Sequence, residues 1–103
     1  MPSFRRVICS DGFHMSVQAG IGAYSDPRDL SNSYKKVEVG FVSDPEEMLI
    51  KYAEEPWMPT RTIYGYVPSE IVGAVIVKHG GLLDGEVPPG GPLFLANAKQ
   101  KKT

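Results

Sequence analysis

Two stretches of alternating apolar and polar residues limit the folds open to this chain. Residues 13–18 read FHMSVQ and residues 36–41 read KVEVGF. A hydrophobic pattern with a period of two residues is typical of a β-strand that is buried on one face and solvent-exposed on the other. In the second stretch we therefore expect Val37, Val39 and Phe41 to share the buried face.

The first of these strands is preceded by the features of a hairpin. Val7 and Cys9 would lie on one face of an earlier strand, and Asp11-Gly12 follows them. Asp-Gly between two alternating stretches is among the strongest short-range signals of an antiparallel hairpin. The sequence therefore predicts that the chain opens with two paired strands.

Two segments carry helix signals, and a strand is expected between them. Residues 43–55 begin with Ser-Asp-Pro-Glu-Glu, which offers an N-cap, a proline at the first helical position and two acids in the first turn. Residues 68–79 begin with proline and end before Gly80-Gly81, as a C-capped helix does. Residues 61–67, RTIYGYV, are rich in strand formers.

These elements predict an α+β domain with a small antiparallel sheet of three to four strands and two helices packed on one of its faces. We place the domain at residues 1–87. Residues 88–103 are rich in proline and glycine and end in a basic run, so we expect a flexible tail there.

Composition excludes several classes of protein. The chain has 103 residues and a formal net charge of −1, which argues against broad electrostatic binding of nucleic acid. It has a single cysteine, so no intrachain disulfide can form. The N-terminus lacks the apolar run of a signal peptide, and no stretch is long and apolar enough to span a membrane. We expect a cytoplasmic protein that does not bind membranes.

The segment between the second and third strands, residues 19–34, is unusually long for so small a domain. Loops of this length are usually functional or disordered. Gly22, Tyr24, Ser25 and Arg28 could hold an anion or stack a planar ring. The alternative is an ordinary turn with a solvated arginine. Gln18 and Tyr34 stand at the two ends of the segment, and we include them in the candidate site.

Aromatic residues form a second candidate surface. Tyr64 and Tyr66 would share the strand face opposite Ile63. Such a face is either a second core layer or a recognition surface. Trp57 stands between two prolines and is either an exposed anchor or a lid on the core.

Catalytic and metal-binding patterns are absent from the sequence. Cys9, His14 and His79 show no metal-ligand spacing and no nucleophile motif. We expect His79 to cap its helix, His14 to be solvated and Cys9 to pack in the core. The sequence therefore predicts no enzyme, no metal and no cofactor.

The stretches DGFHMSVQA, GAYSDPR, VEVGF, YAEEPWMPTRTIYGYVP and KHGG resemble a group of small uncharacterised proteins of tailed bacteriophages. The resemblance covers about residues 4 to 89. It implies a small protein made in the cytoplasm of an infected bacterium, where such proteins often act on host functions or host defence.

The interpretation that follows is a non-enzymatic binding protein, phage-encoded, that inhibits a host protein or complex by occupying its surface. The alternative is a small-molecule binder that sequesters a nucleotide or another anionic ligand with the 19–34 segment. In that alternative Arg28 would contact a phosphate and Tyr24 a base. Open sheet edges would allow a homodimer in either case.

Overall fold

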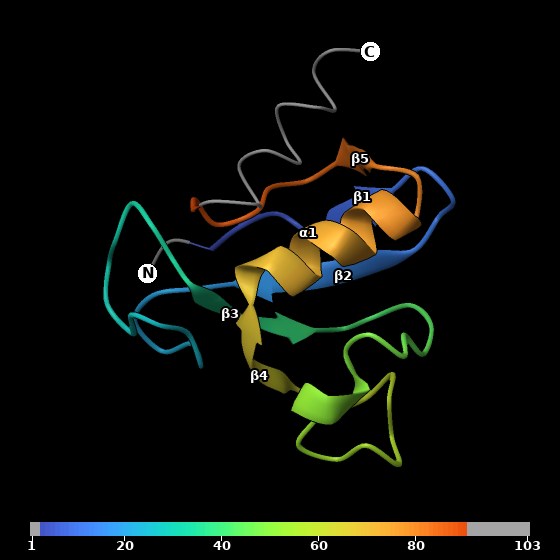
Figure 1. Ribbon diagram of the computed structural model, residues 1–103, viewed down its shortest axis with the longest axis horizontal. Helices are drawn as coiled ribbons and strands as arrows, with labels where there is room; N and C mark the ends of the chain where they lie inside the picture. Colours follow the sequence, from blue (N-terminus) through green and yellow to red (C-terminus); the bar gives the residue numbers. More distant parts are fainter. Residues whose placement is uncertain (1–2, 91–103) are drawn as a thin grey trace.

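The computed structural model describes residues 3–90, which form a five-stranded antiparallel sheet with one α-helix on one face (Figure 1). The strands, in the spatial order β4-β3-β2-β1-β5, are β1 (Val7–Cys9), β2 (His14–Gln18), β3 (Lys36–Gly40), β4 (Tyr64–Pro68) and β5 (Leu82–Asp84). The helix is α1 (Ser69–Lys78), and a single 3₁₀ turn, η1, spans Ile50–Tyr52. The expectation of three to four strands and two helices is therefore wrong in both numbers.

The predicted hairpin is confirmed. β1 pairs antiparallel with β2, with Val7 opposite Met15. The turn is closed by the Asp11 carboxylate, which accepts a hydrogen bond of 2.9 Å from the Phe13 amide, and Gly12 adopts φ +96°. Val7 and Met15 are fully buried, so the alternation of the sequence sets which face of the sheet meets the core.

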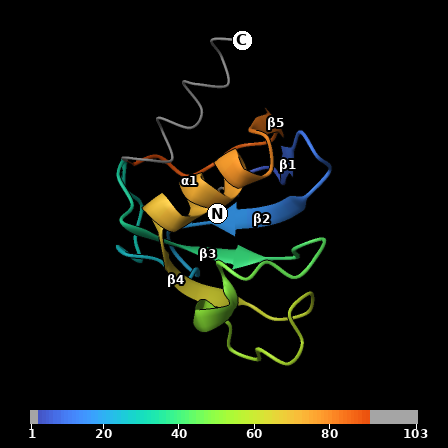
Figure 2. The ribbon, with the colours of Figure 1, turned by 45° about the vertical axis from the view of Figure 1, so that its right-hand side comes forward.

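The core lies between the sheet and α1. Figures 1 and 2 show the helix lying across one face of the sheet, while no helix of residues 3–90 lies on the opposite face. The predicted second helix is confirmed and begins at Ser69. The helix and the facing strands contribute the buried residues Val17, Val37, Val39, Tyr64, Val67, Val72, Val75 and Ile76.

The helix expected at residues 43–55 is absent, because tertiary contacts use the residues that would have started it. The Ser43 amide donates a hydrogen bond to the His14 carbonyl (2.8 Å), and the Ser43 hydroxyl accepts one from the His14 amide (3.0 Å). These two bonds hold Ser43 against β2. The Glu46 carboxylate accepts hydrogen bonds from Lys78 (2.9 Å) and His79 (2.7 Å) at the end of α1. Only the short turn η1 remains.

Phe41 does not face the core as expected. Its backbone has φ +52°, and its side chain is 67% exposed. Val42 is buried in its place. The alternation of β3 therefore ends one residue earlier than the sequence pattern indicates.

The expectation that Tyr64 and Tyr66 share one face is also wrong. The pairing of β3 with β4 shifts register between Val37 and Val39, as at a β-bulge, and Tyr66 has φ +53°. Tyr64 is fully buried with the helix-facing core, whereas Tyr66 is 41% exposed. A bulge places the two rings on different sides, because it inserts one residue into the alternation.

Sequence reasoning missed β5, which has only three residues. It pairs with β1 through Cys9 and Leu82 and continues into a segment that we call the strap, residues 85–90. In the strap, Val87 is buried and the Pro89 carbonyl accepts the Tyr34 amide at 2.9 Å.

The rest of the expected tail, residues 91–103, lies outside the described residues. Among residues 3–90, no helix combines the length and the apolar character needed to cross a membrane.

Candidate functional site

Two residues proposed as ligand contacts in the 19–34 segment instead hold its backbone together. The Ser25 hydroxyl accepts the Gly20 amide (3.0 Å) and donates to the Pro27 carbonyl (2.8 Å), and this side chain is buried. The Tyr34 ring is also buried, and its hydroxyl donates to the Asp29 carbonyl (2.9 Å). The segment is therefore an ordered loop with its own internal polar contacts.

Gln18 and Gly22 have structural roles too. The Gln18 side-chain amide donates to the Phe4 carbonyl (2.8 Å) and its oxygen accepts the Phe4 amide (2.9 Å). This pair ties the N-terminal segment to β2. Gly22 adopts φ +88° in an exposed turn, a conformation that glycine reaches without steric cost.

The structure brings together three of the proposed site residues, Tyr24, Arg28 and Tyr66, which we call the aromatic patch. The Tyr24 and Tyr66 ring centroids are 6.0 Å apart at an interplanar angle of 38°. The Arg28 guanidinium carbon lies 5.4 Å from the centre of the Tyr24 ring, a cation–π distance. Both tyrosines are about two-fifths exposed.

Backbone contacts fix the aromatic patch to β3 and β4. The Tyr24 amide donates to the Glu38 carboxylate (2.9 Å), and the Tyr24 carbonyl accepts the Tyr66 amide (3.0 Å). A Cβ atom at Gly65 would lie 3.3 Å from the Tyr24 Cβ, so the glycine lets the loop approach the strand closely. The patch is thus held by the sheet although it is partly built from a loop.

Tyr66 occupies a backbone conformation that is unfavourable for a bulky residue. Its φ of +53° lies in the left-handed region, which costs an ordinary L-residue about 1–2 kcal/mol. Strained residues of this kind are frequent at functional sites. The strained backbone of Tyr66 carries an aromatic ring that is partly exposed.

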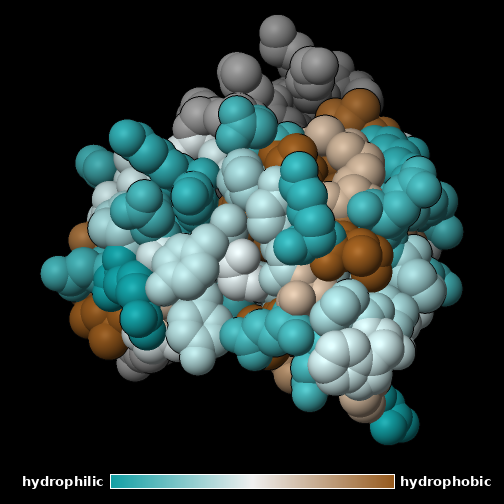
Figure 3. All heavy atoms as spheres, turned by 60° about the horizontal axis from the view of Figure 1, so that its bottom comes forward, coloured by the Kyte–Doolittle hydropathy of each residue, from teal (hydrophilic) through white to brown (hydrophobic). Residues whose placement is uncertain are grey.

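The other two proposed aromatic residues lie outside the patch. Tyr64 is in the core, and its hydroxyl donates to the Pro59 carbonyl, which anchors the turn of residues 54–62. Burial raises the pKa of this hydroxyl. Trp57 is in that turn and is 73% exposed, so it does not cover the core. Figure 3, which looks at the lower side of the molecule in Figure 1, shows a mixed surface with only small hydrophobic islands.

A charge cluster around the buried carboxylate of Glu46 joins the hairpin turn, the 41–50 segment and the end of α1. The two ring nitrogens of His79 lie 2.6 Å from the Asp11 carboxylate and 2.7 Å from the Glu46 carboxylate, and the ring stacks on Phe13 at 4.2 Å. Lys78 adds a second ion pair to Glu46 (2.9 Å). We call Asp11, Glu46, Lys78 and His79 the charge cluster.

The pKa values in the charge cluster favour the charged forms. For His79, burial acts to lower the pKa, but the hydrogen bonds to Glu46 and Asp11 outweigh it and the pKa is raised. For Glu46, burial acts to raise the pKa, but hydrogen bonds from Lys78, His79 and the Met48 amide outweigh it and the pKa is lowered. Since both ring nitrogens already bond carboxylates, His79 is a structural cation.

The expected cap at His79 is confirmed as far as the backbone goes, because its amide bonds the Val75 and Val77 carbonyls. Its two carboxylate partners could not be found from sequence. Glu46 had been expected in a helix start, and Asp11 is 68 residues away along the chain.

Cys9 and His14 do not form a reactive pair. His14 lies opposite Ile8 in the hairpin, whereas Cys9 points into the core. Burial, with a smaller effect of the Asp11 charge, raises the pKa of the Cys9 thiol to about 11, so the thiol is protonated at neutral pH. Within residues 3–90, no group of three or more His, Cys, Asp or Glu side chains is arranged so that it could hold a metal ion.

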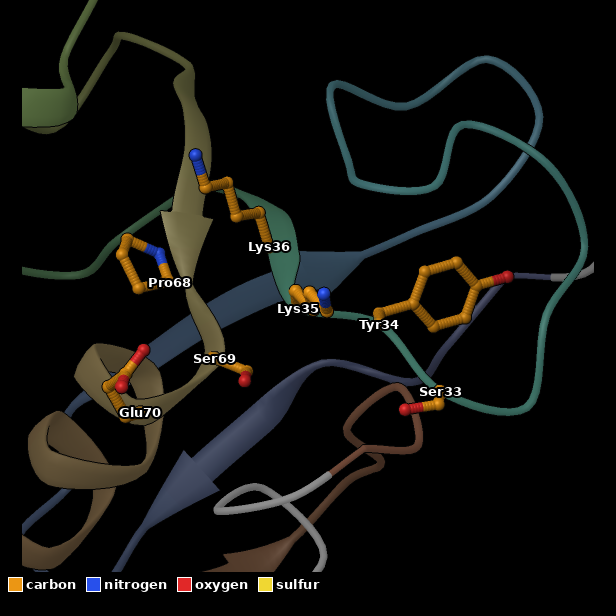
Figure 4. Close-up of a pocket in the computed structure, with 7 residues that line it drawn as sticks. All are labelled: Ser33, Tyr34, Lys35, Lys36, Pro68, Ser69 and Glu70. Carbon is orange, nitrogen blue, oxygen red and sulfur yellow. The ribbon is translucent and has the colours of Figure 1, made fainter.

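A second, hollow site lies at the N-terminus of α1 (Figure 4). It has a volume of about 440 Å³ and lies between the end of the 19–34 segment and the first turn of the helix. Its polar lining comprises Ser33, Lys35, Lys36, Ser69 and Glu70. Sequence reasoning did not single out any of these residues.

Comparison with models of protein families, with curated proteins and with solved structures finds no match to this chain. The resemblance to small bacteriophage proteins therefore stays a prediction, and the candidate sites are argued from their geometry alone.

Proposed function

We propose that this protein is a non-enzymatic binding protein that docks on a partner protein through the aromatic patch. The observation that carries the proposal is Tyr66, whose strained backbone holds a partly exposed ring beside Tyr24 and Arg28. Glycine or asparagine would occupy φ +53° with less strain than tyrosine does.

The residue types of the patch suit a protein surface. Tyrosine and arginine are the residues most enriched at the energetic centres of protein interfaces, together with tryptophan. Arg28 presents several hydrogen-bond donors while its guanidinium rests on a ring, so less freedom is lost when it binds. The complementary partner would present a carboxylate to Arg28 and an apolar group to Tyr66.

Because the sequence resembles small bacteriophage proteins, the partner we propose is a protein or complex of a bacterial host. The chain would inhibit this partner by covering its surface. A base that stacked on the same face of Tyr24 would have to displace Arg28. The geometry therefore favours protein docking over capture of a nucleotide by this loop.

The experiment is capture of host proteins on the immobilised chain, with matched variants. Arg28→Ala and Tyr66→Asn should both release a stoichiometric partner that the unchanged chain retains. Tyr66→Asn should fold, because asparagine tolerates a positive φ. Arg61→Ala removes another exposed arginine, in the 54–62 turn, and should leave capture unchanged.

The named partner is then purified and its affinity measured for each variant. We expect Arg28→Ala to weaken binding by tenfold or more, as for a central interface residue. Absence of a stoichiometric partner, or equal affinity of the Arg28 and Arg61 variants, would overturn the proposal.

A further inference from the structure

From the geometry at the N-terminus of α1, we infer that the pocket there binds a phosphate group. The site is separate from the aromatic patch, and the inference does not depend on the proposed function. It rests on a helix start without a cap, a largely buried serine whose accessible hydroxyl faces the pocket, and an excess of positive charge.

The first turn of α1 has amide groups with no acceptor inside the helix. The N-cap residue is Pro68, which has no side-chain oxygen, and no side chain caps the helix. The Ser69 amide donates to the Lys35 carbonyl at 2.9 Å. The next two amides, of Glu70 and Ile71, belong to the first turn, where helices have no internal acceptors and readily bind anions.

Ser69 supplies the observation that points to a ligand. The residue is only 5% exposed, and its side chain lines the pocket. Among residues 3–90 its hydroxyl forms no side-chain hydrogen bond, and because the oxygen is accessible from the pocket it can donate to a ligand there. Figure 4 shows the hydroxyl groups of Ser69 and Ser33 pointing toward one another across the pocket.

The charge of the pocket favours an anion. Lys35 and Lys36 line it, and none of the ion pairs among the described residues involves either of them. Glu70 is the single acid in the lining, which leaves an excess of one positive charge. In Figure 4 its carboxylate points away from the space between the two serines.

A phosphate group matches these donors better than a carboxylate does. It can accept hydrogen bonds from two hydroxyls, from the first-turn amides and from Lys35 at the same time, because it offers several oxygen atoms in a tetrahedral arrangement. The pocket volume of about 440 Å³ exceeds that of a single phosphate, so a phosphomonoester also fits.

The test is an NMR titration of the full chain with inorganic phosphate at constant ionic strength. We expect saturable shifts at the amides of Ser69, Glu70 and Ile71. Ser69→Ala should weaken binding about tenfold, since it removes a hydrogen bond to a charged group. Lys35→Gln should weaken it in the same direction.

Lys51→Gln is the matched control, because it removes the same charge at an exposed lysine in η1, outside the pocket. It should bind phosphate as the unchanged chain does. Shifts that never saturate, or equal affinities of the Ser69→Ala and Lys51→Gln variants, would overturn the inference.

AMP and adenosine then distinguish free phosphate from a phosphomonoester. If the natural ligand is an ester, AMP should bind more tightly than phosphate while adenosine does not bind. Equal affinity for AMP and phosphate would identify the free anion as the ligand. Shifts caused by adenosine alone would show that the pocket does not recognise phosphate.

Discussion

At the scale of single residues, His79 makes the stability of the fold depend on pH. Its pKa is raised above the ordinary value of 6.5. Its contribution to the free energy of unfolding is therefore fully present below pH 6.5 and is lost as pH rises through the folded-state pKa. The pKa values of Asp11 and Glu46 are lowered from 3.8 and 4.5, so their contributions are lost as pH falls through the folded-state values.

We therefore expect the melting temperature to be highest between about pH 4.5 and 6.5 and to fall on both sides. Calorimetry across this range measures it directly. His79→Gln should lower the maximum and remove most of the fall on the alkaline side. A melting temperature that keeps rising while His79 loses its proton would contradict this assignment.

The backbone of Phe41 is strained, and no packing of its side chain offsets that strain. Its φ is +52° and its side chain is 67% exposed. Phe41→Asn should stabilise the protein by about 1 kcal/mol, because asparagine visits the left-handed region at low cost. Phe41→Ala keeps the strain, because alanine has no polar side chain that could hydrogen-bond locally and favour the left-handed region, so it should change little. Urea unfolding compares the two, and an asparagine variant no more stable than the alanine variant would show that strain is not the cause.

At the scale of elements, local signals predicted the structure where tertiary contacts agree with them. The Asp11-Gly12 hairpin and the helix after Pro68 formed as expected. Residues 43–55 carry an equally good helix start, but Glu46 is drawn to Lys78 and His79 at the far end of the chain. No local pattern reports a contact over more than 30 residues, so this error could not be avoided.

The candidate sites were predictable to a similar extent. Tyr24 and Arg28 were found as side chains of the 19–34 segment and Tyr66 as an aromatic residue of a strand, because residue type indicates what each segment can present. The bulge in β4 and the backbone hydrogen bond from Tyr66 to Tyr24 could not be predicted, nor could the roles of Ser25 and Tyr34 inside the loop. Ser69 was missed because it reads as an ordinary first helical residue.

The edge strand β5 depends on close approach of two backbones. A Cβ atom on Gly85 would meet the Arg6 carbonyl oxygen and would lie 2.7 Å from the Val7 Cα, and φ there is +104°. Gly85→Ala should therefore separate β5 from β1 and cost about 3 kcal/mol.

Gly12→Ala is the control for this prediction, because φ is +96° there but no atom lies within 4 Å of the added carbon. It should cost only the conformational strain, about 1–2 kcal/mol. Urea unfolding of both variants separates the two effects, and equal costs would show that close approach to β1 is unimportant.

At the scale of the whole molecule, the strap connects parts of the chain that are far apart in sequence. Glu86 donates its amide to the Arg5 carbonyl (3.1 Å), and its carboxylate accepts the Arg5 amide (3.0 Å). Four residues later, Gly90 lies so close to Tyr34 that a Cβ atom would be 2.8 Å from its amide nitrogen. The strap thus holds the N-terminal segment and the 19–34 loop, which supplies parts of both candidate sites.

We expect a chain that ends at residue 84 to be about 3.5–5 kcal/mol less stable than one that ends at residue 90. The shorter chain loses the burial of Val87, worth about 1.5–3 kcal/mol, and the backbone hydrogen bonds to Arg5 and Tyr34, worth about 1 kcal/mol each. Hydrogen exchange should show lost protection first at the Tyr34 and Ser31 amides, because Tyr34 orders the loop. If those amides stay protected in the shorter chain, the loop is ordered by its own contacts, and the strap does not support the two sites.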